Sequence, residues 1–178
     1  MTNAAVTIYS GGVHAALQPT VIKTLLGSCI AVCLYDPVRA VGGMNHFLLP
    51  RGNGDGDDTA RFGVHAMDRL IGATMKAGGD RRRFVAKVFG GANVLDVKIS
   101  VVNVAQRNID FINTFLEEEG IPVLSKDVGG RYPRHLRFHT ETGRAFVKRV
   151  RRLRQRLLAD ERDAATSSVA YGGVTLFE

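Results

Sequence analysis

The feature that most constrains the fold of this chain is an unbroken apolar run at residues 29–35, which has the length of one β-strand. Gly27-Ser28 precedes the apolar run and Asp36-Pro37 ends the run, as turn residues commonly do. A run that is apolar at every position suits a strand buried on both faces, although a short helix also fits. The fold therefore needs covering layers on both sides, and 178 residues suffice for one domain with a sizeable core.

The flanking patterns supply such layers. β-Branched and apolar residues at 21–26 precede the run, and residues 44–49 predict a strand that returns beside it. Apolar residues at three- and four-residue steps predict helices at 60–77 and 103–119, and a polar Gly/Asp-rich loop is expected at 51–59. Further strands are predicted at 84–89, 123–127, 136–139, 145–150 and 173–177. This order predicts an α+β fold, with helices packed on a largely antiparallel sheet system.

Composition and charge narrow the classes of protein. Apolar residues make up 45% and charged residues 23%, which is ordinary for a globular domain. The longest apolar runs are too short to cross a bilayer, and residues 1–10 lack the pattern of a secretory signal, so we expect a cytoplasmic protein. The net charge of +7 favours acidic partners, which leaves nucleic acid, an anionic membrane face and acidic proteins open.

The two cysteines, Cys29 and Cys33, are four residues apart. On a strand this spacing separates them by roughly 13 Å, at about 3.3 Å per residue. A disulfide needs Cα atoms within about 7 Å of each other. We therefore expect two free thiols, in agreement with a reducing compartment.

Cys29 and His46 are the residues that suggest chemistry. A pairing centred near residues 37–38 places them roughly opposite each other on neighbouring strands, where a thiol and an imidazole can meet. The Gly27-Ser28 turn directs backbone N–H groups toward a bound carbonyl. Two other interpretations remain open from the residues alone. In the first interpretation, both side chains are core packing residues. In the second, they are zinc ligands together with Cys33, although a structural zinc site needs a fourth ligand.

Several motifs are similar to those of one protein family. The sequence resembles the signature of the CheD-type chemoreceptor glutamine deamidases in segments that follow one another over residues 5–150. These segments are Thr24-Leu25-Leu26-Gly27-Ser28-Cys29, Gly42-Gly43-Met44-Asn45-His46, Phe89-Gly90-Gly91-Ala92, Arg107-Asn108-Ile109 and Asp127-Val128-Gly129-Gly130-Arg131. So long an ordered match is far more specific than a single Cys and His pair, and it favours a catalytic role for both residues over core packing.

The resemblance implies an α/β sandwich similar to that of bacterial toxin deamidases. It implies hydrolysis of receptor glutamine side chains to glutamate with release of ammonia, with Cys29 as nucleophile, His46 as base and Thr24 as the third member of the site. Backbone N–H groups at Ser28 and Cys29 would steady the oxyanion. No cofactor and no metal ion are implied. Residues 1–150 would form one catalytic domain, with a basic helix and a short strand appended at 151–178.

The resemblance also indicates partners. The cytoplasmic domains of chemoreceptors would be the protein substrate, and some members of the family bind a chemotaxis phosphatase of the CheC type. The basic segment at 148–162 is interpreted either as a solvated helix or as a docking element for acidic receptor helices or the inner membrane face. Nucleic acid is not expected as a partner, because no groove-reading motif is present, and no segment is expected to insert into a membrane.

Overall fold

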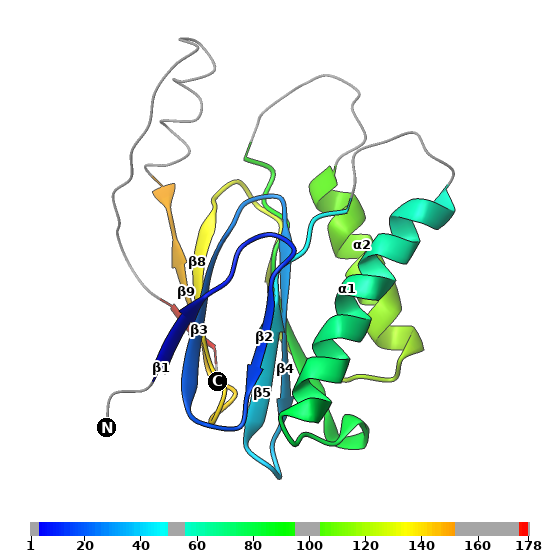
Figure 1. The fold of residues 1–178 in the computed structure, drawn as a ribbon. Coiled ribbons are helices and arrows are strands. Elements are labelled where there is room, and N and C mark those ends of the chain that lie inside the picture. The colour runs from blue at the N-terminus through cyan, green and yellow to red at the C-terminus, as the bar shows by residue number, and fades with distance from the viewer. Residues whose placement is uncertain (1–3, 50–55, 95–103, 152–174, 178) are drawn as a thin grey trace.

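The described residues form two five-stranded sheets and two α-helices, consistent with the predicted α+β class (Figure 1). The computed structural model describes residues 4–49, 56–94, 104–151 and 175–177, with the side chains of its first helix described from residue 62 onward. Sheet A has the strand order β1-β3-β8-β9-β10 and sheet B the order β2-β5-β4-β6-β7. The strands are β1 (Ala4–Thr7), β2 (Val13–Ala16), β3 (Thr20–Leu26), β4 (Ile30–Asp36), β5 (Val41–Asn45), β6 (Val85–Gly90), β7 (Val123–Val128), β8 (Arg134–His139), β9 (Ala145–Arg149) and β10 (Thr175–Phe177).

Sheet B lies between sheet A and the two helices, α1 (Gly56–Lys76) and α2 (Val104–Glu118), as Figure 1 shows. Its central strand is β4, the apolar run. Ile30, Val32 and Leu34 belong to the hydrophobic cluster between sheet B and the helices. Ala31 and Cys33 belong to the cluster between the two sheets. The run is therefore a strand buried on both faces, and the alternative of a short helix is wrong.

Two predicted elements differ from the structure by three or more residues at an end. Helix α1 begins at Gly56, so the predicted loop at 51–59 is in part the first turn of this helix. Strand β5 runs from Val41 to Asn45 rather than over 44–49, because Gly42 and Gly43 pair with β4. Both glycines lie where a Cβ atom would meet the next layer. Gly-Gly here is a site of close packing, which the sequence pattern does not distinguish from a turn.

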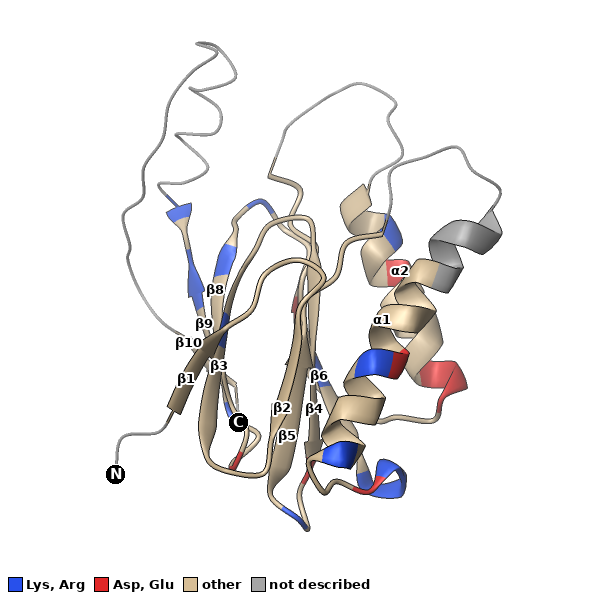
Figure 2. Ribbon diagram, viewed as in Figure 1, with Lys and Arg blue, Asp and Glu red and all other residues tan. Residues whose placement is uncertain are grey.

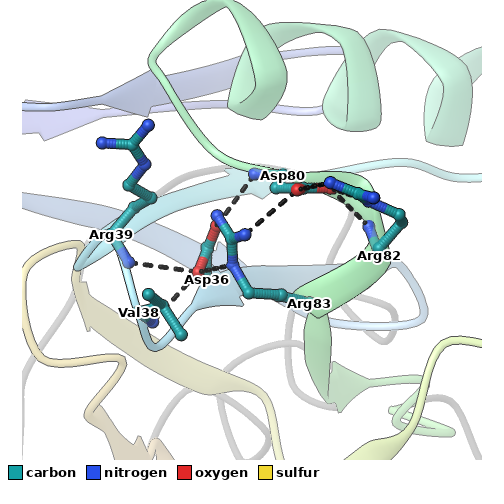
Figure 3. A network of polar contacts seen from close by, with 6 residues as sticks. All are labelled: Asp36, Val38, Arg39, Asp80, Arg82 and Arg83. Carbon is teal, nitrogen blue, oxygen red and sulfur yellow. Dashed lines mark hydrogen bonds and ion pairs between the residues drawn. The ribbon is translucent and has the colours of Figure 1, made fainter.

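The hairpin between β4 and β5 is held by a buried carboxylate (Figure 3). Asp36 is fully buried, and its Oδ1 accepts hydrogen bonds from the backbone N–H groups of Val38 and Arg39 at 3.0 and 3.1 Å. Its Oδ2 accepts from the Asp80 N–H and from Arg83 Nη2, both at 2.8 Å. Arg83 belongs to η1 (Arg81–Arg83), so the network joins this hairpin to the connection between α1 and β6.

Positive charge is prominent on sheet A. Figure 2 shows Lys and Arg along β8 and β9, and the residues concerned are Arg134, Arg137, Lys148 and Arg149. The predicted basic helix at 151–165 lies outside the described residues apart from Arg151. Within the part of the chain that the structure describes, neither helix is long and apolar enough to span a membrane.

Candidate active site

Thr24 and His46 meet between the two sheets. Buried and exposed residues alternate along the second half of β3, so the Thr24 side chain faces sheet B. His46 directly follows β5 and lies two residues beyond Met44, whose side chain is in the cluster between the sheets. The Thr24 Oγ1 and His46 Nδ1 atoms are 2.7 Å apart, and both side chains are buried. The structure thus joins two of the residues that the sequence had nominated separately.

The hydrogen bonds of Thr24 determine the tautomer of His46. The Thr24 hydroxyl has one proton, which it donates to the Ile8 carbonyl at 2.8 Å. It must therefore accept from His46 Nδ1–H, which leaves Nε2 unprotonated. His46 Nε2 is buried, and no side chain or backbone group of the described residues bonds to it. The ring thus holds an unpaired proton acceptor in the interior.

Cys29 lies on the same face of sheet B, but not where the predicted pairing places it. Ile30 pairs with Phe47 and Cys33 with Met44, so His46 lies opposite Ala31 rather than Cys29. The predicted register is wrong by two residues, because Asp36 pairs with Val41 and a four-residue turn separates them. Cys29 and His46 are consequently diagonal neighbours, which still share one face of the sheet.

The two cysteines are both free, as predicted, and differ in their surroundings. Cys33 is buried in the cluster between the sheets, whereas Cys29 precedes β4, is partly exposed and packs at the margin of that cluster. Burial raises the pKa of both thiols, and that of Cys33 far more. For Cys29 the effect is partly opposed by a hydrogen bond from its own backbone N–H. Only the Cys29 thiol is therefore placed to meet a substrate.

The electrostatics favour an uncharged pair at rest. Burial lowers the pKa of His46 to about 4, since no described acidic group compensates the loss of solvation of its cation. The raised pKa of the Cys29 thiol acts in the same direction. At neutral pH the site therefore contains a thiol and a neutral imidazole, rather than a preformed thiolate and imidazolium.

Three consecutive carbonyl groups around Cys29 are each held by a hydrogen bond. The Gly27 oxygen accepts from the Ala92 N–H at 2.8 Å, and the Cys29 oxygen accepts from the Gly91 N–H at 2.7 Å. The Ser28 oxygen accepts from the side-chain Nδ2 of Asn108 at 2.9 Å. The turn that presents the thiol is thus fixed from outside, by the loop after β6 and by α2.

Gly90 and Gly91 make this contact possible. Gly90 has a φ of 113°, and a Cβ atom there would collide with the Cys29 carbonyl oxygen. A Cβ at Gly91 would lie 2.6 Å from Ile109 of α2. The pair belongs to the Phe89-Gly90-Gly91-Ala92 motif. The structure shows that it braces the backbone of Cys29.

A buried ion pair that sequence reasoning missed supports the same loop. Arg134 Nη2 lies 2.9 Å from Asp127 Oδ1 and donates to the Gly129 carbonyl at 2.7 Å. The Gly129 N–H in turn donates to the Gly90 carbonyl at 2.9 Å. Asp127 and Gly129 were in one of the quoted motifs, but nothing local in the sequence pairs them with Arg134.

The described residues offer no metal centre. No group of three or more His, Cys, Asp or Glu side chains among them is arranged to hold a metal ion. Cys29, Cys33 and His46 are all described, and they do not converge on one point. The zinc interpretation therefore has no support from the structure.

Comparison with known proteins gives a consistent result. Residues 48–149 match the model of the family described as CheD, chemotactic sensory transduction. This range includes Gly90, Asn108 and Asp127, while Thr24, Cys29 and His46 precede it.

Curated relatives cover more of the chain. A protein of Chromobacterium violaceum is 46% identical over 83% of this chain and 75% of its own length. One of Anaeromyxobacter dehalogenans is 46% identical over 83% of this chain and 85% of its own length, and one of Ruegeria sp. is 44% identical over 97% and 95%. All three are named as probable chemoreceptor glutamine deamidases. From the family match and these identities, the chain belongs to the CheD family.

Proposed function

We propose that this protein is a chemoreceptor glutamine deamidase that uses Cys29 as its nucleophile and His46 as its general base. The names of its relatives support the reaction and the substrate class. The observation that carries the residue roles is the 2.7 Å contact between Thr24 and His46, because it leaves the buried Nε2 as the free proton acceptor on the face that Cys29 shares.

The first half of the reaction follows from the neutral pair. His46 Nε2 takes the thiol proton of Cys29 as the sulfur attacks the side-chain carbonyl carbon of a glutamine, so a C–S bond forms and the carbonyl oxygen becomes negative. The Cys29 N–H is the candidate donor to this oxyanion, with Ser28 N–H beside it. His46, now an imidazolium, returns the proton to the amide nitrogen, and ammonia leaves as the C–N bond breaks.

The second half consumes one water. His46 Nε2 removes a proton from water, and the hydroxide attacks the thioester carbon. The C–S bond then breaks, the His46 imidazolium returns its proton to the sulfur, and the product glutamic acid side chain ionises as it leaves, which restores the Cys29 thiol and the neutral ring. Throughout, Thr24 accepts a hydrogen bond from His46 Nδ1–H and donates one from its own hydroxyl to the Ile8 carbonyl. This arrangement keeps the ring oriented in both of its charge states. The residues of the site carry out each step without a cofactor.

The proposal is tested by incubating cytoplasmic fragments of chemoreceptors with the protein and mapping glutamine-to-glutamate conversion by mass spectrometry, beside an assay of ammonia release. We expect conversion by wild type and a loss of at least about 1,000-fold in Cys29→Ala, since the other described thiol, that of Cys33, is buried. Cys33→Ala is the matched control and should retain activity. Failure of wild type to convert any receptor glutamine, or turnover by Cys29→Ala, would contradict the proposal.

A cytoplasmic location and binding to a CheC-type phosphatase are further parts of the proposal. Pulldown with such a phosphatase and with receptor fragments, using wild type and Cys29→Ala, separates binding from catalysis. An adaptor role alone predicts that both forms bind and that neither releases ammonia.

A further inference from the structure

Asn108 connects the two segments that carry the proposed nucleophile and base. It lies in α2, and its side chain is fully buried. Its Nδ2 donates to the Ser28 carbonyl at 2.9 Å, and its Oδ1 accepts from the Leu49 N–H at 2.9 Å. One contact is directly before Cys29 and the other is three residues after His46. A single amide thus ties both sides of the site to the helix behind sheet B.

The contact with Ser28 sets the direction of the next N–H. No cis peptide occurs among the described residues, so the Ser28 C=O and the Cys29 N–H lie in one peptide plane and point in opposite directions within it. Since the oxygen is directed at α2, the Cys29 N–H is directed away from α2, toward the space between the sheets. The Cys29 side chain packs on that same side.

The hydrogen bonding of the Cys29 N–H agrees with a role in binding a negatively charged oxygen. No carbonyl of the described residues accepts a hydrogen bond from the Cys29 N–H, whereas the Ile30 N–H is bonded to the Phe47 carbonyl at 2.9 Å. The effect of this N–H on its own thiol is to lower the thiol pKa, as expected for a donor that faces the sulfur. The same donor is available to an oxygen that becomes negative beside the sulfur.

Among the described groups that hold this turn, Asn108 supplies the one side chain. The flanking carbonyls of Gly27 and Cys29 are bonded to backbone N–H groups of Ala92 and Gly91. A substitution at those positions leaves the donors in place, whereas a substitution at Asn108 removes one. The orientation of the Ser28–Cys29 peptide therefore depends on this residue in a way that mutation can test.

We infer that Asn108 is a positioning residue, which holds the Ser28–Cys29 peptide so that the Cys29 N–H donates to the oxyanion formed during amide hydrolysis. This inference rests on the proposed function. It assigns Asn108 no contact with substrate. Removal of one oxyanion donor typically costs about 100- to 1,000-fold in kcat, and a misdirected donor should cost a similar amount.

The first test compares two reactions of the same thiol in Asn108→Leu. Deamidation of a receptor fragment forms an oxyanion, whereas alkylation of Cys29 by iodoacetamide displaces iodide from carbon and forms none. We expect the kcat for deamidation to fall about 100-fold while the alkylation rate changes by less than about 3-fold. A merely structural role predicts that both rates change together, or that neither does.

Asn45→Leu is the matched control. Asn45 is also a buried amide that joins a strand to a helix, because its Oδ1 accepts from the Val32 N–H at 3.0 Å and its Nδ2 donates to the Ala66 carbonyl at 3.1 Å. Loss of two such hydrogen bonds should lower the Tm of both variants similarly. Only Asn108→Leu should lose deamidation at a temperature where both are folded.

Asn108→Asp supplies a second readout should the leucine variant not fold. Its carboxyl group still accepts from the Leu49 N–H, but it donates to the Ser28 carbonyl only when protonated. We therefore expect the ratio of its deamidation rate to that of wild type to fall as pH rises through the pKa of the new carboxyl. The ratio for Asn45→Asp should stay flat over the same range.

The outcomes separate the inference from the function on which it rests. Wild type without deamidation would overturn both. Two outcomes would overturn the inference alone, in each case with a wild type that deamidates. In one, Asn108→Leu has the same kcat for deamidation as wild type. In the other, its alkylation rate falls in parallel with its kcat for deamidation. A flat pH ratio for Asn108→Asp would do the same.

Discussion

The two ends of β4 hold buried polar groups in opposite states. At the Asp36 end, each carboxylate oxygen accepts at least two hydrogen bonds, and the bonds from Arg83 chiefly hold the pKa of the carboxyl well below its usual range (Figure 3). At the Cys29 end, His46 uses one ring nitrogen, and the other has no partner among the described residues. Both groups are nearly or fully inaccessible to solvent.

The difference indicates which end stabilises and which end reacts. A buried polar group whose hydrogen-bonding capacity is fully used by the protein has no free acceptor position for a proton or a substrate. A buried acceptor without a partner costs stability, of the order of 1–3 kcal/mol, and is retained where chemistry uses it. The Asp36 network is therefore structural, and the unpaired His46 nitrogen agrees with the proposal that Thr24, His46 and Cys29 form the reactive end of the strand.

The largest change in stability is expected at the Asp36 end of β4. Asp36→Ala removes the acceptor for three backbone N–H groups and for Arg83, so the free energy of unfolding should fall by about 3 kcal/mol. Urea denaturation measures this change, and activity per folded molecule should be unaltered. Arg82→Ala, which removes an exposed guanidinium from the same network, should have little effect. If Asp36→Ala and Arg82→Ala lost the same free energy of unfolding, the contrast between the two ends of β4 would be wrong.

A substitution at the other end of β4, near Cys29, should lower the rate of deamidation strongly and stability only slightly. Thr24→Val keeps the shape of the side chain but removes the acceptor for His46 Nδ1–H, so kcat should fall about 10- to 100-fold with KM nearly unchanged. The free energy of unfolding should fall by only about 1 kcal/mol. Thr24→Ser restores the hydroxyl and should recover most of the rate. A Thr24→Ser variant as slow as Thr24→Val would show that the hydroxyl is not what matters.

The smallest effect concerns the resting charge state. Because burial raises the pKa of the Cys29 thiol, its thiolate fraction at pH 7 should lie below the few per cent of a free cysteine. Alkylation by iodoacetamide should then be slower than for free cysteine by a few-fold, and should rise with pH into the alkaline range. His46, with its pKa near 4, stays neutral between pH 7 and 5 and adds no inflection there. A rate plateau across that range would instead indicate a thiolate–imidazolium pair.

Much of the fold could be predicted because its signals are local. The alternation of buried and exposed residues in β3 and the three- and four-residue spacing in α2 follow directly from the periods of a strand and a helix. The start of β5, which was predicted at residue 44 and lies at Val41, shows the limit of this reasoning. A glycine required by a turn and one required by the close approach of another layer look the same in a sequence, and only the neighbours across the core distinguish them.

The sequence by itself determined that Cys29 follows a Gly-Ser turn at the start of a doubly buried strand, and its motifs nominated Thr24 and His46 beside it. Only the tertiary structure decided which nitrogen of His46 holds the proton, since that depends on the Ile8 carbonyl accepting from Thr24 across the fold. It also decided that Asn108, 80 residues along the chain from Ser28, donates a hydrogen bond to the carbonyl directly before Cys29. Short-range periodicity carries no information about such contacts, because they arise only when the layers have packed.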